Sequence, residues 1–254
     1  MRHPGLALAW VAIVHAVSPR AAADEAAAAP SRLACLLRHY AGRAEHTDGR
    51  WFLVLPGGGR APWEGAPGRS LAARIEDPAP ADTFAMPYVT GPITPVVDPA
   101  QDPGRARFLP LFAATYGDPP RSLVRFRFLG HALRVHPRLL APLGRVVARL
   151  GPHLDATQRA HLVPPAGGFA RRNIAGTERR SAHAFGIAID HSAARAHYWR
   201  WQKEPGPPRW RSTTPATIVA AFEAEGFIWG GRWYHYDTMH FEYRPELVGE
   251  GACP

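Results

Sequence analysis

The alternation of hydrophobic and polar residues predicts three strands in the C-terminal half of the chain. Residues 123–129 carry hydrophobic side chains on one face and arginines on the other. Residues 186–190 place two isoleucines opposite glycine, alanine and aspartate, and residues 239–243 alternate apolar side chains with a histidine and a glutamate. Because successive side chains of a strand point to opposite faces, each segment has one core face and one face that is free for other roles.

Helical spacing is clearest in residues 214–226, where a threonine is expected to cap the helix, a proline to open it and a glycine to end it. Residues 137–151 also have helical spacing, weakened by an internal proline and glycine. A third helix is expected in residues 102–117, with Asp102 as N-cap and Gly117 as stop, and a proline inside it that kinks or shortens it.

The N-terminal half has a weaker pattern. Residues 50–60 read as a strand flanked by turns, and residues 56–104 have many prolines and glycines without a clear period, which predicts loops. The order of elements indicates an α+β fold with an antiparallel sheet and flanking helices. We expect an irregular N-terminal region, residues 24–120, to pack on a second domain, residues 121–250.

The first residues have the order of a secretory signal peptide. A short basic start precedes a 12-residue apolar run at residues 6–17, and an Ala-x-Ala site follows at residues 21–23. This run is too short for a membrane span, and no later segment is long and apolar enough for one. We therefore expect residues 1–23 to be a signal peptide and the protein to be secreted, to the periplasm.

Charge and cysteine content fit export. The formal net charge is +9, almost all of it from arginine, since Lys203 is the only lysine. Such a charge favours polyanionic surroundings, either nucleic acid or a bacterial envelope, and export argues against nucleic acid. Two cysteines, Cys35 and Cys253, can pair in only one way in an oxidising compartment, so we expect a disulfide between the two ends of the mature chain.

Four polar residues in the predicted strands could form a metal centre. His183 lies seven residues before Asp190, so both reach one ion only if the chain turns near residues 185–186. Asp237 precedes His240 by three residues, which also permits a common site. Two histidines and one carboxylate form a typical catalytic zinc site, and a second carboxylate can act as a base. Either segment alone is more often a solvated strand face; the two together favour the metal centre.

Two stretches carry a resemblance to a known family. "SAHAFGIAID" at residues 181–190 and "GFIWGGRWYHYDTMHFEYRPE" at residues 226–246 resemble the VanY-type zinc D-alanyl-D-alanine carboxypeptidases. More narrowly, they resemble subfamily C of metallopeptidase family fifteen, with the pattern S-x-H-x-x-G-x-A-x-D and later W-G-G-x-W…D-x-M-H-F-E. The similarity covers about residues 167–246 and implies the hedgehog/D,D-peptidase fold. Residues 24–120 match nothing in the core pattern of the family.

The resemblance implies that His183, Asp190 and His240 bind Zn²⁺. It places Asp237 at the position of the family's general base, which is Glu in some members. Asp237 would take a proton from the water that attacks the peptide bond and later pass it to the leaving amine. The expected cofactor is therefore one zinc ion.

Substrate-contacting residues also follow from the resemblance. "GGFARRNIAGT" at residues 167–177 resembles the family's G-x-Y-x-x-R stretch, which places Arg172 at the substrate-polarising arginine, with Arg171 as the neighbouring alternative. Ser181 matches a serine that is implied to contact substrate. After Asp190 many relatives continue with an Asn-Pro segment, whereas this chain has "HSAARAHYWRW", so its pocket walls differ.

Several nearby residues have simpler interpretations. His191 should point away from the face of Asp190, as a buried or rim histidine. His235 lies close to Asp237, but its spacing to His240 suits no simple metal site. Glu242 shares a face with His240 and either orients it or is solvated. The core and the cleft wall are the expected places of Trp199, Trp201, Trp229 and Trp233.

We therefore expect a secreted zinc peptidase of the D-alanyl-D-alanine carboxypeptidase type, acting as a monomer on peptidoglycan stem peptides. An L-alanyl-D-glutamate endopeptidase or an L,D-carboxypeptidase are alternatives, because the sequence does not decide which bond is cut. A non-catalytic zinc-containing peptidoglycan-binding module is an alternative of another class, against which Asp237 and Arg172 argue. A nucleic-acid binder is disfavoured by the signal peptide and by the lack of a concentrated basic stripe beside aromatics.

Overall fold

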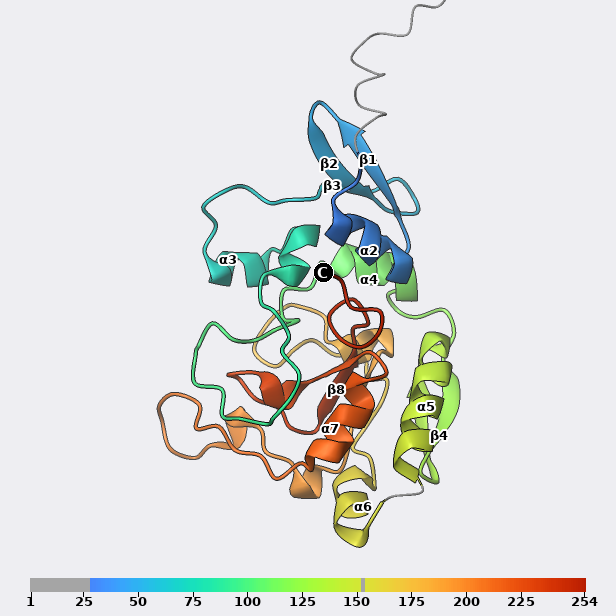
Figure 1. Cartoon of the computed structure of the whole chain (residues 1–254), viewed down its shortest axis with the longest axis vertical. Helices are drawn as coiled ribbons and strands as arrows, with labels where there is room; N and C mark the ends of the chain where they lie inside the picture. Colours follow the sequence, from blue (N-terminus) through green and yellow to red (C-terminus); the bar gives the residue numbers. More distant parts are fainter. Residues whose placement is uncertain (1–27, 152–153) are drawn as a thin grey trace, which may run out of the picture.

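The computed structural model describes residues 28–151 and 154–254 and has an α+β architecture, as the sequence predicts. Its strands form three small antiparallel sheets, in the orders β1-β2-β3, β4-β5 and β6-β8-β7. Figure 1 shows the first sheet at one end of the molecule and α6 at the other, with β8 and α7 in the lower half. The predicted signal peptide, residues 1–23, lies outside the described residues.

The N-terminal half contains more regular structure than its sequence pattern predicts. Its elements are α2 (Ser31–His39), β1 (Arg43–Thr47), β2 (Arg50–Val54), β3 (Arg60–Pro62), α3 (Leu71–Glu76), the 3-10 helix η1 (Pro80–Phe84) and α4 (Leu109–Tyr116). The strand expected at residues 50–60 corresponds to β2, which pairs with β1 and β3 on its two edges. The boundary that we predict at residue 120 stays a prediction.

The C-terminal half begins with a hairpin and a helix and ends with the sheet β6-β8-β7. Its strands and α-helices are β4 (Val124–Phe128), β5 (His131–Val135), α5 (Leu140–Leu150), α6 (Ala156–Leu162), β6 (Ala188–Asp190), α7 (Ala216–Glu223), β7 (Phe227–Trp229) and β8 (His240–Tyr243). Single-turn 3-10 helices join them: η2 (Pro137–Leu139), η4 (Ala182–Phe185), η5 (Ala193–Arg195), η6 (Trp199–Trp201) and η7 (Gly230–Arg232).

The main core lies between α7 and the sheet that contains β8. Phe222 of α7 stacks on Phe241 of β8 with ring centroids 3.9 Å apart, and Phe227 of β7 meets Phe222 edge-on at 5.5 Å. These rings are fully buried, as are Ile187 and Ile189 on the core face of the segment predicted as a strand. The opposite face of the same short strands is therefore left for polar residues.

Three expectations about local structure are wrong. Residues 56–104 are not only loops: β3 pairs across the turn at Leu55–Gly59, and the Ser70 side chain caps α3 by accepting from Ala73 N–H. Neither β3 nor α3 has a buried residue, so neither has an apolar face that would produce a period in the sequence. The predicted cap of α7 is also wrong, since Pro215 is the N-cap and the hydroxyl of Thr214 has no partner among the described residues.

The helix expected from Asp102 begins later, at Leu109. Its Pro110 lies in the first turn, the one place in a helix where the missing N–H of proline costs nothing. Gly104 also prevents an earlier start, because its φ is +83°. A Cβ at this position would come within 2.5 Å of Ile228, so the 102–107 segment crosses closely behind β7. The stop at Gly117 is confirmed.

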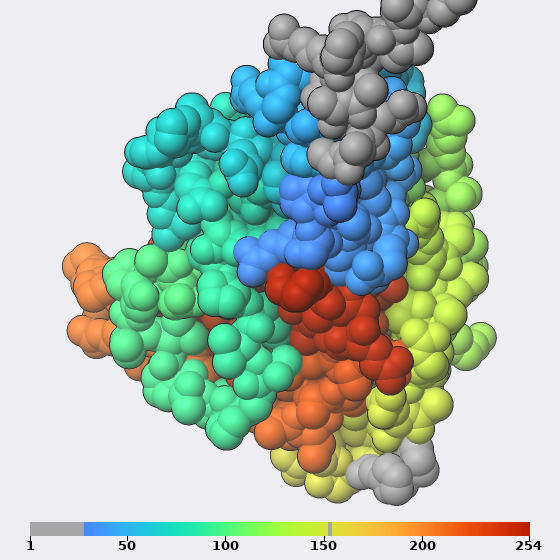
Figure 2. Space-filling view, turned by 45° about the horizontal axis from the view of Figure 1, so that its top comes forward, coloured from blue at the N-terminus to red at the C-terminus, as the bar shows by residue number. Residues whose placement is uncertain are grey.

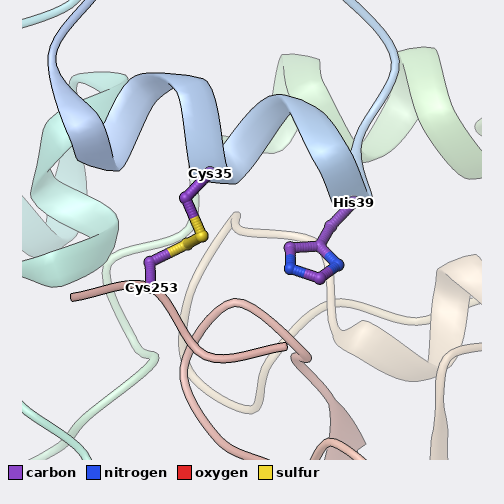
Figure 3. A group of neighbouring side chains, drawn as sticks. All are labelled: Cys35, His39 and Cys253. Carbon is purple, nitrogen blue, oxygen red and sulfur yellow. A yellow bond between two sulfur atoms is a disulfide. The ribbon is translucent and has the colours of Figure 1, made fainter. Parts of the chain in front are cut away.

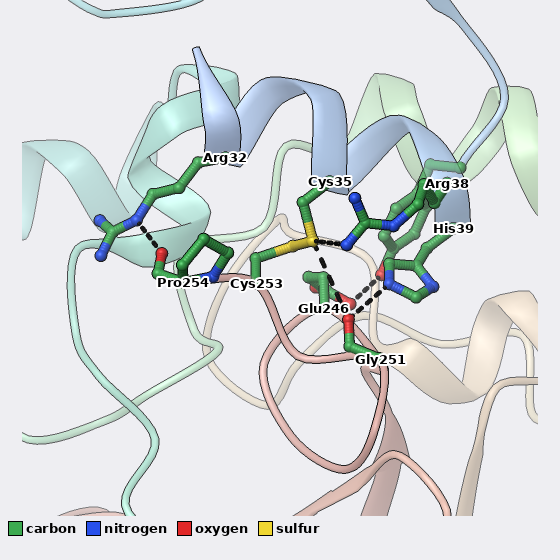
Figure 4. Close-up of a disulfide and its surroundings, with 9 residues drawn as sticks. Arg32, Cys35, Arg38, His39, Glu246, Gly251, Cys253 and Pro254 are labelled. Atoms are coloured by element: carbon green, nitrogen blue, oxygen red, sulfur yellow. Dashed lines mark hydrogen bonds between the residues drawn. A yellow bond between two sulfur atoms is a disulfide. The ribbon is translucent and has the colours of Figure 1, made fainter.

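A disulfide and several hydrogen bonds connect the two ends of the described chain. A disulfide joins Cys35 of α2 to Cys253, 218 residues away, as predicted, and Figure 3 shows the two side chains beside His39. Close by, the Arg32 side chain donates to Pro254 O at 2.6 Å and a ring nitrogen of His39 lies 2.8 Å from Gly251 O (Figure 4). The space-filling view shows the blue N-terminal helix directly against the red C-terminal residues (Figure 2).

Replacing Cys35 and Cys253 together by serine should lower the free energy of unfolding by about 2–4 kcal/mol, because the bond closes a very long loop in the unfolded chain. Denaturant unfolding of the oxidised parent and of the double variant measures this difference. A reducing agent should destabilise the parent and leave the double variant unchanged. Equal unfolding free energies for parent and variant would contradict a stabilising role.

The polar network between the two halves is buried as well. The Arg244 side chain is completely buried and donates to Glu246 and Glu242, at 2.6 and 3.2 Å, and to Gly104 O at 2.7 Å. Tyr40 donates to Glu246 at 2.8 Å. Because each of these groups would be costly to bury alone, the network ties α2 and the 102–107 segment to the end of β8. None of the helices in the described residues is long and apolar enough to cross a membrane.

Candidate metal centre and substrate cleft

The sheet register brings the predicted ligands together. Asp190 on β6 pairs directly with His240 on β8, so their side chains project from neighbouring positions of one sheet face. His183 joins them from η4, which ends at Gly186 in the left-handed conformation with a φ of +69°. The turn that the sequence requires between His183 and Asp190 is therefore present, at the predicted place.

The three side chains form a nearly equilateral triangle of ligand atoms. His183 Nε2 lies 3.1 Å from Asp190 Oδ1 and 3.2 Å from His240 Nδ1, and His240 Nδ1 lies 3.1 Å from the same Asp190 oxygen. Two ligand atoms of a tetrahedral zinc, each about 2.0–2.1 Å from the metal, are about 3.3 Å apart. The geometry of this cluster therefore fits a zinc ion bound by three protein ligands.

The other nitrogen of each ring is held by the protein. His183 Nδ1 lies 2.6 Å from Gly168 O, and because a carbonyl only accepts, Nδ1 carries the proton and Nε2 is free to bind a metal. His240 Nε2 lies 3.4 Å from a carboxylate oxygen of Glu242, which leaves Nδ1 for the metal. Such outer partners fix the ring orientation of metal-binding histidines.

The electrostatics of the cluster favour a cation at its centre. Burial opposes ionisation of Asp190, yet the charge of His183 and hydrogen bonds from both histidines hold the pKa of this carboxyl well below its usual range. Burial alone would lower the pKa of His240, but hydrogen bonds to Asp190 and Glu242 raise it to about 9. The surroundings thus stabilise positive charge at the point where the three ligand atoms meet, and a metal ion would replace that proton.

Glu242 is completely buried, so the alternative of a solvated glutamate is wrong. Arg107 forms a two-pronged ion pair with it, with Nε 2.8 Å from Oε1, and Arg244 donates to it at 3.2 Å. Burial opposes ionisation of Glu242, but the charge and hydrogen bonds of Arg107 hold its pKa well below the usual value. The carboxylate is therefore ionised beside His240.

Replacing Glu242 by glutamine should weaken zinc binding by about 10–100-fold, because the neutral amide no longer balances the arginines or orients the His240 ring. Competition with a chelator of known affinity measures the loss. Glu178→Gln, a substitution outside the cluster and its network, is the matched control. Unchanged zinc affinity in Glu242→Gln would mean that the carboxylate contributes only to folding.

Asp237 lies next to the cluster without being part of it. It lines the same cavity as Asp190 and His240, and its Oδ1 is a buried atom with no hydrogen-bond partner among the described residues. Burial, aided by the negative charge of Asp190, raises the pKa of Asp237 to about 6 against the opposing effect of His240. An unpartnered carboxylate oxygen with a pKa near neutrality is suited to accept and return a proton.

The cavity has a volume of about 310 Å³ and opens over the cluster. Arg172 lines it, whereas Arg171 does not, and the Arg172 guanidinium lies 4.0 Å from Asp190 Oδ2. Ser181 lines it too; its hydroxyl accepts from the backbone N–H of His183 at 3.4 Å and so begins η4. The structure thus brings both predicted substrate contacts to the cavity that holds Asp237.

The remaining aromatic and histidine residues divide as the sequence suggests. Trp229 is completely buried, and three other tryptophans line the cavity, namely Trp199, Trp201 and Trp233. His191 is buried on the opposite face, with neither ring nitrogen bonded within the described part of the chain. His235 binds Asp102, with Nδ1 2.6 Å from Oδ2, and takes no part in the metal-type cluster.

Sequence reasoning missed three residues of the N-terminal half at this site. The sequence predicts only a helix start at Asp102, whereas Arg105 and Arg107 line the cavity and Asp102 binds His235. Their partners are 130 to 135 positions away along the chain. The only local signal is an unusual concentration of charge in a proline- and glycine-rich stretch, "DPGRARF".

A second group with metal-ligand chemistry has a different explanation. Cys35, His39 and Cys253 place their ligand atoms close together (Figure 3), but the two sulfurs are bonded to each other. A disulfide sulfur is not a thiolate, which is the form that binds zinc. This group is therefore a covalent link between the chain ends, and within the described residues the His183 cluster is the one whose donors are free.

Comparison with known proteins finds a family match over the segment that carries the cluster. Residues 175–243 match the family model described as D-alanyl-D-alanine carboxypeptidase. The matched segment contains the metal-type cluster and Asp237, whereas Arg172 and the 102–107 segment lie outside it. Comparisons with curated proteins and with solved structures give no match. Subfamily C stays a prediction; the segment that carries the cluster is similar to the D-alanyl-D-alanine carboxypeptidases of metallopeptidase family fifteen.

Proposed function

We propose that the protein is a zinc-dependent peptidase that hydrolyses a peptide bond of the peptidoglycan stem, of the D-alanyl-D-alanine carboxypeptidase type. The family match supports a peptidase acting on peptidoglycan. One observation carries the proposal: Asp190 and His240 of the ligand triangle line the same cavity as Asp237, whose Oδ1 has no partner among the described residues. Metal binding alone would not require that buried base.

A zinc ion held by the triangle would polarise the scissile carbonyl and make a water more acidic. Asp237 supplies what the metal does not, a place for the proton. Its free Oδ1 takes the proton of the attacking water and later returns it to the leaving amine. Burial of the carboxylate raises its pKa to about 6, which suits a group that accepts and returns a proton.

Two further residues bind and orient the substrate in this proposal. Arg172 is about half-exposed at the cavity wall, and its guanidinium can donate to the carbonyl oxygen as negative charge develops there. Ser181 lies at the start of η4, where its hydroxyl can also donate to a bound peptide while its oxygen accepts from His183 N–H. Both lie beside the cluster before substrate arrives, so little reorganisation is needed.

Digestion of purified sacculi with the zinc-loaded protein tests the proposal. Mass spectrometry should show stem peptides shortened by one terminal D-alanine, because the proposed bond joins the last two residues of the pentapeptide. A matched digestion after removal of zinc with a chelator should show no change. Cleavage between L-alanine and D-glutamate, or of an L,D bond, would replace the carboxypeptidase assignment. Zinc and peptidoglycan binding without any cleavage would favour the non-catalytic module.

Export to the periplasm is part of the proposal. The signal-peptide pattern of residues 1–23 motivates it, and the Cys35–Cys253 disulfide is of a kind that persists in oxidising compartments. Peptidoglycan lies in that compartment, and the basic charge of the chain favours its anionic surroundings.

A further inference from the structure

The segment of residues 101–107 forms part of the cavity wall although it lies outside the matched family segment. Its backbone is hydrogen-bonded to the cavity side of the chain: Tyr234 N–H donates to Gln101 O at 2.7 Å, and the indole of Trp233 donates to Pro103 O at 2.7 Å. These contacts hold the segment in one position. Side chains that it presents to the cavity are therefore fixed relative to the metal-type cluster.

Asp102 holds two side chains of the cavity, Arg105 and His235, in place through hydrogen bonds. Its Oδ1 accepts the backbone N–H of His235 at 3.0 Å, and its Oδ2 accepts from both Arg105 Nη1 and His235 Nδ1 at 2.6 Å. Arg105 Nη1 and His235 Nδ1 are also only 3.0 Å apart, which the shared carboxylate makes possible. Asp102 itself is 2% exposed, so the accessible part of this trio consists of the arginine and the histidine.

The trio leaves hydrogen-bonding capacity directed to a ligand. Among the described residues, Arg105 has hydrogen-bond partners for Nη1 alone. Its Nε and Nη2 can therefore donate to a ligand. His235 donates through Nδ1 to Asp102, so its Nε2 can donate to a ligand only when the ring carries a proton there as well. Trp199 packs edge-on against His235 with ring centroids 4.8 Å apart and limits how the ring can turn. Both side chains line the cavity that contains Asp237 and are partly exposed.

The charge of the cavity favours an anionic partner for these donors. Arg107 is neutralised by Glu242. Within the described residues, Arg172 reaches a carboxylate only at 4.0 Å, in Asp190 of the metal-type cluster, and Arg200 donates to the backbone oxygen of Ala175. A guanidinium fork with a neighbouring histidine matches a planar carboxylate, which can accept two parallel hydrogen bonds. Stem peptides carry several free carboxylates, so the chemistry of the subsite and of the proposed substrate agree.

We propose that Arg105 and His235, held in place by Asp102, form a subsite that binds a free carboxylate of the peptide substrate. The N-terminal half then takes part in substrate selection and does more than pack against the peptidase segment. The identity of the peptide rests on the proposed function, whereas carboxylate-dependent binding at this subsite can be measured without any turnover.

Calorimetric binding to the zinc-loaded full chain tests the subsite, with Asp237→Asn present in every protein to prevent cleavage. The probes are a stem pentapeptide with all carboxylates free and two versions amidated singly, at the C-terminus and at the α-carboxyl of D-glutamate. Arg105→Gln should weaken binding of the free peptide by at least ~10-fold, as expected for a lost charge-assisted hydrogen bond. In the protein that keeps Arg105, one of the two amidations should weaken peptide binding by the same factor as Arg105→Gln does.

The decisive result is non-additivity. The peptide amidated at the recognised carboxylate should bind equally well with and without Arg105→Gln, because both changes remove the same interaction. His235→Gln should give the same pattern with a smaller loss, and Arg127→Gln, which removes an exposed arginine of β4 far along the chain from the cavity, should change nothing. Equal losses on free and amidated peptides, no loss, or no binding of the free peptide would each overturn the subsite.

The subsite and the proposed function can fail separately. The chain with Asp237 intact could cleave no stem peptide while binding still depended on Arg105 and on one carboxylate; the peptidase proposal would then fall and the subsite would stand. Conversely, efficient cleavage with binding indifferent to Arg105 and His235 would keep the peptidase and remove the subsite. Arg105→Lys retains a cation near Asp102, so its partial recovery of carboxylate-dependent binding separates loss of the fork from loss of folding.

Discussion

Replacing His240 by alanine should release zinc and reduce stem-peptide cleavage to background. His240 supplies one corner of the ligand triangle, with Nδ1 3.1 Å from Asp190 Oδ1 and 3.2 Å from His183 Nε2. With two ligands left, zinc affinity should fall by at least ~10²-fold, since each ligand of a protein zinc site carries a few kcal/mol of the total binding energy. Metal analysis after gel filtration, with a chelator competition, measures the loss.

The control for this substitution is His131→Ala, which removes an exposed histidine of β5 and should leave one zinc per chain. Circular dichroism should show that His240→Ala keeps its secondary structure, because Phe241 beside it still packs on α7. Full retention of zinc by His240→Ala would contradict the ligand assignment. Loss of zinc with retained cleavage would contradict the dependence of the reaction on the metal.

The alternation of side chains explains how much of the C-terminal sheet could be predicted. On β8, Phe241 faces the core while His240 and Glu242 share the other face, and β6 shows the same division between Ile189 and Asp190. Such a period is visible in the sequence because each strand has one apolar and one polar face. The N-terminal half could be predicted only in part: the pattern predicts β2, but β1 and β3 have no buried residue and therefore no apolar face that the sequence would reveal.

The candidate site could be predicted only as far as local sequence encodes it. The positions of His183, Asp190 and His240 follow from two short motifs, and the sheet register brings them together. Nothing local indicates that Arg107 balances Glu242, because the two lie 135 positions apart and meet only in the folded chain. A buried ion pair of this kind has no periodic signature; its members look like ordinary surface charges in the sequence.

The contacts of Asp102 with Arg105 and His235 could not be predicted from local sequence either. Asp102 followed by a proline is a common helix start, and only the positive φ of Gly104 and the later Pro110 direct the chain elsewhere. Because no helix begins at Asp102, its carboxylate accepts no hydrogen bonds from helix N–H groups. It accepts them from Arg105 and His235 instead. A local prediction failed here because a tertiary contact uses the same residue.

Replacing Asp237 by asparagine should reduce turnover by about 10²–10⁴-fold while zinc content stays near one per chain. Asparagine keeps the shape of the side chain but cannot take a proton from water. Asp237 is not a member of the ligand triangle, so the metal should remain. Single-turnover cleavage of a stem peptide, with metal analysis of the same sample, measures both quantities.

The two readouts together separate an enzyme from a binding module. Gln158→Glu replaces a partly exposed residue of α6 that does not line the cavity, and this control should cleave at the parent rate. If Asp237→Asn also cleaved at the parent rate, Asp237 would not be the base. His235 would then be the next residue to test, because it lines the same cavity and its ring is already oriented by Asp102. Glu242 is less suited to that role, since its carboxylate is buried against Arg107 and Arg244 and holds its proton poorly.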